Sequence, residues 1–165
     1  MVRRLLELLP GLSFSVSATT RAPRPGEVEG VHYRFVTDAE FDRLVRDGAF
    51  LEWAEVFGHR YGTLWEPIAR DLERGRDVVL EIDVQGAAAV RERQPQAVLI
   101  FLAPPSEEEL ERRLRARRTE DEADLARRLA AAREELGQRG WFHHVVVNDD
   151  VERAAREVAA IIEAR

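Results

Sequence analysis

Residues 15–27 read Ser15-Val-Ser-Ala-Thr-Thr-Arg-Ala-Pro-Arg-Pro-Gly-Glu27, and the rest of the chain can be interpreted around this stretch. A strand predicted over residues 12–17 runs into a loop in which Pro23 and Pro25 fix φ and keep their predecessors extended. The loop holds Arg21 and Arg24 apart on a stiff spacer. Hydroxyl donors lie beside them on Ser17, Thr19 and Thr20. A planar guanidinium matches two phosphate oxygens at once, so the stretch predicts a phosphate-binding loop; the alternative is a solvated, arginine-bearing turn.

The composition limits the classes of protein to which the chain can belong. Its 165 residues suit a single domain, and it has no apolar run of about 18 residues and no signal-peptide pattern, so we expect neither a membrane span nor export. The absence of cysteine excludes disulfides and thiolate metal sites and fits a cytoplasmic location. No metal-ligating residues are predicted. The net charge of −6 argues against a general nucleic-acid binder, so an anionic ligand needs a local arginine cluster. The oligomeric state is not indicated.

Strands and helices are predicted to alternate along the chain. Strands are expected over residues 12–17, 32–36, 50–57, 58–63, 77–82, 97–102 and 145–147, and helical segments over 2–9, 37–47, 66–74, 84–93 and from 151 onward. The β-branched run 77–82 is typical of a central parallel strand covered on both faces. The alternation therefore predicts an α/β fold, a parallel sheet with helices on both faces. The half-polar strands between 32 and 63 indicate a small inserted β/α sub-domain.

Several helix starts and one flap can be assigned from local pattern. Capping boxes, in which Ser or Thr is followed three residues later by Glu, begin at Thr37, Ser106 and Thr119. Residues 148–150 are expected to cap the last helix. The segment 113–138 is mostly charged residues and alanine with little to bury, which indicates a helical flap.

The strand-and-turn segment 52–63 carries side chains that could read a base. A fixed carboxylate on Glu52 could accept both donors of a guanine edge and would reject adenine. The alternative is a surface glutamate. Thr63 supplies a hydroxyl that could reach guanine O6, and Tyr33 and Tyr61 could bond phosphate or simply pack in a hairpin.

Four further residues stand where a ligand could be held. Asp83 ends a buried strand and could hold a ribose, a base amine or a magnesium-bound water, or cap the next helix. Arg117 and Arg128 bracket the turn of the flap, where arginines could neutralise a phosphoryl transition state, or form a solvated charged face. Asn148 is the single asparagine of the chain and could cap a helix or contact an adenine edge.

Taken together, these motifs resemble guanylate kinases from about residue 12 to the end. The matching pieces are S-V-S-A-T-T-R-A-P-R-P-G-E, G-V-H-Y, F-L-E-W-A-E-V, Y-G-T, L-E-I-D-V-Q-G-A, F-L-A-P-P-S, R-T-E and V-V-V-N-D-D. The resemblance implies a single guanylate-kinase-like domain over 1–165. Its parts would be a core of about 1–18, 76–112 and 139–165, a GMP-binding sub-domain of about 19–75 and a lid of about 113–138.

The resemblance also implies an activity and a role for each candidate residue. The reaction would be phosphoryl transfer from ATP, with Mg²⁺, to GMP, giving ADP and GDP in purine nucleotide metabolism, with these nucleotides as the partners and no nucleic acid or membrane. The residues that resemble the family's GMP phosphate ligands are Ser17, Arg21, Arg24, Tyr33 and Tyr61. Those that resemble its guanine ligands are Glu52, Thr63 and Asp83. Arg117 and Arg128 resemble the lid arginines on the ATP phosphates, Asn148 resembles the adenine contact, and Arg21, Arg117 and Arg128 would be the catalytic set.

One departure from the family pattern bears on activity. Guanylate kinases open with a strand and a G-x-x-x-x-G-K-[ST] phosphate loop, and the sequence from Met1 onward contains neither that motif nor any lysine. We therefore expect impaired kinase activity in this chain, because the amide cradle, the lysine and the metal-binding hydroxyl of that loop are missing. The alternative is a non-catalytic guanylate-kinase-like module that binds GMP or a protein partner.

Overall fold

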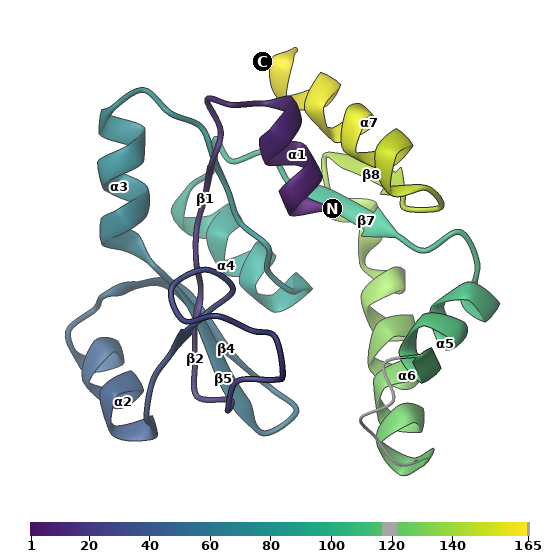
Figure 1. The fold of residues 1–165 in the computed structure, drawn as a ribbon, viewed down its shortest axis with the longest axis horizontal. Helices are drawn as coiled ribbons and strands as arrows, with labels where there is room; N and C mark the ends of the chain where they lie inside the picture. Colours follow the sequence, from purple (N-terminus) through teal and green to yellow (C-terminus); the bar gives the residue numbers. More distant parts are fainter. Residues whose placement is uncertain (117–121, 165) are drawn as a thin grey trace. The chain divides into compact units, whose positions relative to one another are not determined.

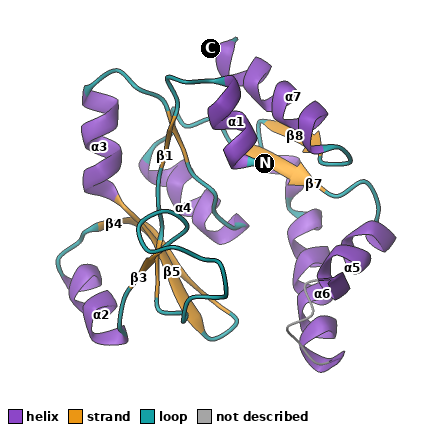
Figure 2. Ribbon diagram, in the orientation of Figure 1, coloured by secondary structure: helices purple, strands orange, loops and turns teal. Residues whose placement is uncertain are grey.

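The structure is a computed structural model that describes residues 1–116 and 122–164 (Figure 1). The chain divides into two compact units, which are considered separately. Unit 1 comprises Met1–Leu8 and Val98–Arg165, and unit 2 comprises Leu9–Ala97. Both contain helices and parallel strands, which confirms the α/β class (Figure 2). The predicted boundaries of core, GMP-binding sub-domain and lid stay predictions.

Unit 2 contains two sheets and three helices. Its strands are β1 (Ser13–Phe14), β2 (Ala18–Thr19), β3 (Arg34–Phe35), β4 (Phe50–Val56), β5 (His59–Leu64) and β6 (Val78–Val79), and its helices are α2 (Asp38–Arg46), α3 (Trp65–Glu73) and α4 (Val84–Arg93). β1 pairs in parallel with β6. The second sheet has the order β3-β2-β5-β4, in which β2 is parallel to β3 and antiparallel to β5. The predicted hairpin of 50–57 and 58–63 is confirmed as β4 and β5.

The strand predicted over residues 12–17 is wrong in its extent, because the chain changes sheets within it. Ser13 and Phe14 pair with β6, and Ser15 still donates its backbone N–H to the Val79 carbonyl (3.1 Å). From Ala18 the backbone pairs instead with β3 and β5. The segment between β1 and β2 thus connects the parallel pair to the four-stranded sheet. The loop that carries Arg21 and Arg24 follows β2.

The central strand predicted over residues 77–82 is also shorter than its sequence pattern indicated. It is limited to Val78–Val79, both only half-buried, and the described strands place β1 alone beside it. Leu80 and Ile82 nevertheless pack against the buried cluster of Leu51, Ile68 and Val90. Apolar character therefore correctly predicted packing but not the length of hydrogen-bonded strand.

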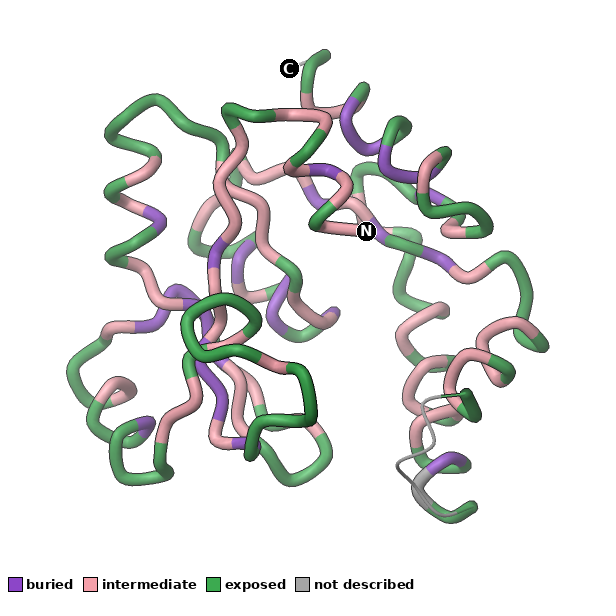
Figure 3. The backbone as a smooth tube through the Cα atoms, viewed as in Figure 1, coloured by how far each residue is buried: buried purple, intermediate pink, exposed green. Residues whose placement is uncertain are grey.

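Helix α2 begins as its capping box predicts. The Thr37 hydroxyl accepts from the backbone N–H of Glu40 (3.2 Å), and the Glu40 carboxylate accepts from the backbone N–H of Thr37 (2.8 Å). This reciprocal pair satisfies two donors at the helix start. The helix then presents Phe41, which is fully buried against Ala18 and Phe50. Figure 3 shows buried residues of unit 2 both in the four-stranded sheet and along α4.

Unit 1 contains one parallel pair of strands and four α-helices among its described residues. Its elements are α1 (Val2–Leu8), β7 (Ile100–Ala103), α5 (Glu107–Ala116), α6 (Glu122–Gly137), a 3₁₀ turn (Arg139–Trp141), β8 (His144–Val147) and α7 (Val151–Glu163). β7 and β8 are parallel and in register from Ile100 opposite His144 to Ala103 opposite Val147. Val146 is fully buried. The described parallel pairs of the chain are therefore β1–β6 and β2–β3 in unit 2 and β7–β8 in unit 1, and they do not form one continuous sheet.

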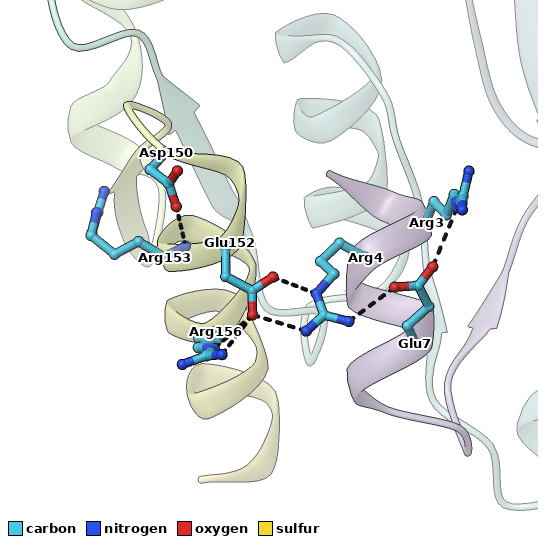
Figure 4. Close-up of polar contacts among 7 residues, drawn as sticks. All are labelled: Arg3, Arg4, Glu7, Asp150, Glu152, Arg153 and Arg156. Atoms are coloured by element: carbon cyan, nitrogen blue, oxygen red, sulfur yellow. Dashed lines mark hydrogen bonds and ion pairs between the residues drawn. The ribbon is translucent and has the colours of Figure 1, made fainter.

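Helix α1 is bound to α7 by ion pairs as well as by packing (Figure 4). The Arg4 guanidinium donates through Nε and Nη2 to the Glu152 carboxylate, the second bond measuring 2.9 Å, and through Nη1 to Glu7 (2.9 Å). These bonds lower the pKa of Glu152 to about 2. Leu5 is buried on the same short helix. Arg4 makes two hydrogen bonds to the Glu152 carboxylate, and these restrict the orientation of α1 against α7 more than a single bond would.

The remaining helix starts agree in part with the sequence. Ser106 caps α5, since its hydroxyl accepts from the backbone N–H of Glu109 (3.2 Å). The cap of α7 is Asp150, whose carboxylate accepts from the backbone N–H of Arg153 (2.8 Å). The capping box expected at Thr119 lies outside the described residues. No described helix is both long and apolar enough to cross a lipid bilayer.

Candidate functional site

The side chain of Arg21 is the centre of one cluster in unit 2. Arg21 is only 8 % exposed. Its Nε donates to the Tyr61 hydroxyl (3.2 Å), and its Nη2 donates to Glu27 Oε1 (2.8 Å). The hydrogen bond that Arg21 donates to Glu27 raises the pKa of the guanidinium, so Arg21 is a permanent cation held in a fixed direction. A buried, oriented guanidinium of this kind can bind an anion with little loss of side-chain entropy.

The carboxylate of Glu27 organises the loop around this cation. Besides Arg21, it accepts from the backbone N–H of Arg24 through Oε2 (2.7 Å). The hydrogen bond from Arg21 holds the pKa of Glu27 below its ordinary value. The Glu27 carboxylate therefore closes the loop between Arg21 and Glu27 with two charge-assisted hydrogen bonds, one from the Arg21 side chain and one from the Arg24 backbone. Glu27 is the last residue of the 15–27 motif, and no role was predicted for it from the sequence.

Two tyrosines complete the Arg21 cluster. The Arg21 guanidinium carbon lies 5.4 Å from the centroid of the Tyr33 ring, within cation–π range. Tyr33 and Tyr61 meet edge to face with ring centroids 5.9 Å apart. Burial raises the pKa of Tyr33 above its ordinary value, so its hydroxyl keeps its proton and can donate. The structure thus brings both predicted tyrosines to Arg21, where they pack and present hydroxyls at once.

The other predicted loop residues are arranged differently from Arg21. Arg24 is exposed and Ser17 is half-buried. The hydroxyl of Thr19, a fully buried residue, accepts from the backbone N–H of Arg21 (3.2 Å), and the Thr20 hydroxyl accepts from the backbone N–H of Arg60 (3.0 Å). Both threonine hydroxyls therefore stabilise the local backbone as acceptors, which leaves the O–H of each as a donor.

A second cluster in unit 2 surrounds the carboxylate of Glu52 on β4. Glu52 is 5 % exposed, which rules out the surface-glutamate alternative. The hydroxyl of Thr63, opposite it on β5, donates to Glu52 Oε1. Burial raises the pKa of Glu52 above its ordinary value; the bond from Thr63 opposes that rise, and the charge of Asp83 adds to it. The arrangement gives a desolvated carboxylate whose direction is set by a neighbouring hydroxyl.

The first turn of α4 borders the Glu52 carboxylate. Asp83 is the N-cap of α4, and its carboxylate accepts from the backbone N–H of Gly86 (2.8 Å), which confirms the predicted capping role. A Cβ atom placed on Gly86 would lie 2.7 Å from Glu52 Oε2. Gly86 therefore leaves the space that the carboxylate fills. Its importance depends on a contact across the fold, and no local sequence signal marks it.

The predicted residues of unit 1 form a separate group. Arg128 lies half-buried on α6, and Arg117 falls outside the described residues. Asn148 follows β8, and its buried Oδ1 atom has no hydrogen-bond partner in the described part of the chain. An acceptor of this kind suits an amine donor from a ligand. Within residues 1–116 and 122–164, no group of three or more His, Asp or Glu side chains is placed to hold a metal ion.

Comparison with known proteins gives a consistent result over nearly the whole chain. Residues 3–165 match the family model described as guanylate kinase. The chain is 49 % identical over 160 residues to a guanylate kinase of Caldanaerobacter subterraneus subsp. tengcongensis, covering 97 % of this chain and 78 % of that protein. It is 54 % identical over 152 residues to a guanylate kinase of Streptomyces coelicolor, covering 92 % and 77 %. A crystal structure of guanylate kinase from Anaplasma phagocytophilum matches with a TM-score of 0.83 and 37 % identity, covering 98 % and 79 %.

Proposed function

The chain belongs to the guanylate kinase family of nucleoside monophosphate kinases, and we propose that unit 2 binds GMP for phosphoryl transfer from ATP, giving ADP and GDP in purine nucleotide metabolism. The observation that carries this proposal is the pair of clusters in unit 2. One presents a buried cation suited to a phosphate, and the other presents a buried carboxylate suited to a base with adjacent N–H donors. GMP has one group for each.

At the phosphate end, Arg21 supplies the main contact. A phosphate bound there would exchange with the Glu27 carboxylate or share the guanidinium with it, because Glu27 already occupies Nη2. The hydroxyls of Tyr33 and Tyr61 add neutral donors beside the cation. Arg24 and Ser17 provide a second cation and a hydroxyl from the same loop and its leading segment, and we assign them the supporting phosphate contacts.

At the base end, Glu52 distinguishes guanine from adenine. Its carboxylate accepts from N1–H and N2–H₂ of guanine, whereas adenine would present an acceptor at N1 and leave a buried carboxylate unpaired. Thr63 orients Glu52 through its hydroxyl, whose single O–H would turn from Glu52 to donate to guanine O6. Asp83 contributes its second carboxylate oxygen. Since donors to an ionised carboxylate favour its charged form, GMP binding should lower the raised pKa of Glu52.

The ATP end of the reaction is assigned to unit 1. Asn148 would accept from the exocyclic amine of adenine, and Arg117 and Arg128 would neutralise the transferring phosphates. The family uses Mg²⁺ with ATP. The described residues include no metal-ligating cluster. The impaired transfer expected from the sequence and the cytoplasmic location stay predictions.

Two measurements on the intact chain test this function in order. Calorimetry with GMP and with AMP at matched salt should show tighter binding of GMP, and equal affinities would defeat the assignment of the base end. Coupled detection of ADP with ATP, Mg²⁺ and GMP then asks whether transfer occurs. Selective GMP binding without ADP release would agree with the impaired transfer expected from the sequence and with the non-catalytic module alike, whereas ADP release would rule out the module.

A further inference from the structure

Strand β4 is irregular immediately before Glu52. Phe50 stands opposite Leu64, but Glu52 rather than Leu51 stands opposite Thr63, so two residues of β4 face one residue of β5. The burial pattern breaks at the same place, because Phe50, Leu51 and Glu52 are all buried in succession. In a regular strand, alternate residues point to opposite faces. The extra residue of this β-bulge re-aims the side chain that follows it, which is Glu52.

The last residue of α4 is bound to this bulge. Arg93 donates through Nη1 to the carbonyl oxygens of Phe50 (3.2 Å) and Leu51. A bulge disrupts the ladder of backbone hydrogen bonds and leaves acceptors to be satisfied by other groups. Arg93 lies more than forty positions away from these acceptors in sequence. The bulge is thus held from outside its own sheet.

The two ends of α4 act on the same segment of β4. At the start of the helix, Gly86 leaves room for the Glu52 carboxylate. In the middle, Val90 packs with Leu51 in the buried cluster. At the end, Arg93 bonds the carbonyls that precede Glu52. A rigid helix therefore sets both where the backbone bulges and where the carboxylate comes to rest.

We propose that Arg93 is a positioning residue for guanine recognition, which holds the β4 bulge so that Glu52 presents its carboxylate to the base. The inference rests on the proposed GMP-binding function of unit 2. Arg93 acts through Phe50 and Leu51 and makes no contact with the ligand itself. Its charge also counteracts the rise that burial causes in the pKa of Glu52, which favours the ionised form that accepts from guanine.

The test compares three variants of the full chain with the wild type. Arg93→Met removes every donor and keeps the apolar stem, and Arg93→Lys keeps the charge but replaces the fork with a single ammonium. Arg46→Met is the matched control, because Arg46 is likewise the last residue of a helix of unit 2 and is exposed. Each protein is titrated with GMP and with AMP by calorimetry. Hydrogen exchange at the amides of residues 51–53 is measured without ligand.

Arg93→Met should lower the ratio of GMP to AMP affinity about fivefold, the order of one lost hydrogen bond, and speed exchange at residues 51–53. Arg93→Lys should lower the ratio about twofold, since the ammonium keeps the charge and its donors but lacks the planar guanidinium that fixes the direction of Nη1. Arg46→Met should match the wild type in both measurements.

Several results would overturn the positioning role. One is an Arg93→Met protein with the wild-type ratio. Another is a lowered ratio with unchanged exchange, because Arg93 would then act on the ligand rather than on the bulge. Should Arg93→Met fail to fold, a wild-type ratio in Arg93→Lys decides against the proposal. If the wild type itself binds GMP and AMP equally, the proposed function fails, and unchanged exchange in the Arg93 variants then separately decides against the positioning role.

Discussion

Glu27 and Glu52 are the same residue type in the same unit, yet their surroundings push them in opposite directions. Glu27 lies on a loop against the Arg21 guanidinium, and its pKa is lowered. Glu52 lies on a strand, buried against a neutral hydroxyl, and its pKa is raised. The first carboxylate balances a charge; the second is an acceptor with no cation directly bonded to it in the described contacts. The difference teaches that the phosphate end is built on charge and the base end on matched hydrogen bonds.

The largest effect should follow from removing the charge at the phosphate end. Arg21→Met should weaken binding of GMP and AMP alike by about 2–5 kcal/mol, because the phosphate is common to both and a buried charge-assisted contact is lost. Calorimetry with both nucleotides measures this, with Arg46→Met as the control. A loss confined to GMP would show that Arg21 belongs to the base end and would break the division between the two clusters.

Glu52→Gln should affect the base end alone. One acceptor becomes a donor facing N1–H or N2–H₂ of guanine, so GMP should bind about 1–3 kcal/mol more weakly while AMP binding changes little. Glu55→Gln is the matched control, since Glu55 lies on the same strand and is exposed. An unchanged ratio of GMP to AMP affinity in Glu52→Gln would remove Glu52 from the role of guanine reader.

Gly86→Ala should separate folding from recognition at the same end. Alanine favours a helix over glycine by about 1 kcal/mol, which should stabilise α4. The added Cβ, however, would displace the Glu52 carboxylate. We expect GMP affinity to fall by about 1 kcal/mol with AMP affinity unchanged, the lower end of what overpacking costs. Retention of full GMP selectivity would mean that the carboxylate can move aside without consequence.

The smallest effects should appear in the pH dependence of stability. Because the pKa of Glu52 is raised on folding, its contribution lowers the free energy of unfolding as pH rises from the unfolded pKa through the folded one. The contribution of Glu27 has the opposite sign: it is present above the unfolded pKa and is lost as pH falls through the lowered folded value.

The two substitutions Glu52→Gln and Glu27→Gln should therefore change the pH profile in opposite ways. Glu52→Gln should remove the fall in the free energy of unfolding that occurs as pH rises. Glu27→Gln should remove the fall in the free energy of unfolding that occurs as pH is lowered. Urea midpoints taken between about pH 3 and pH 7 span both windows. If the urea midpoints of the two variants changed with pH in the same way, the contrast between the two carboxylates would be contradicted.

Local patterns in the sequence predicted those parts of the site that depend on neighbours along the chain. The capping box at Thr37 and the N-cap at Asp83 are confirmed, because each needs only the backbone three residues ahead. The hairpin that places Glu52 opposite Thr63 followed from alternation and a turn. The resemblance gave Arg21 and Tyr61 each as a phosphate ligand, but their contact joins residues forty positions apart and was not predicted.

The remaining parts depend on contacts that no periodicity encodes. Arg93 bonds main-chain carbonyls, which every residue possesses, so its partners leave no trace in sequence. Gly86 matters for the space beside it rather than for a turn. The strand predicted over 77–82 was too long because apolar residues can pack on a core without extending a ladder. Side-chain chemistry is thus easier to predict than the backbone that aims it.

The bond between Arg4 and Glu152 joins positions 148 apart in sequence within unit 1, and residues 9–97 interrupt that unit. Closing so long a disordered segment carries an entropic cost that grows with its length. If the interrupting segment is already folded, its two ends are held at a fixed separation and the effective loop becomes short. Folding of unit 2 would then precede the docking of α1 on α7, and the first helix of the chain would be among the last to reach its native place.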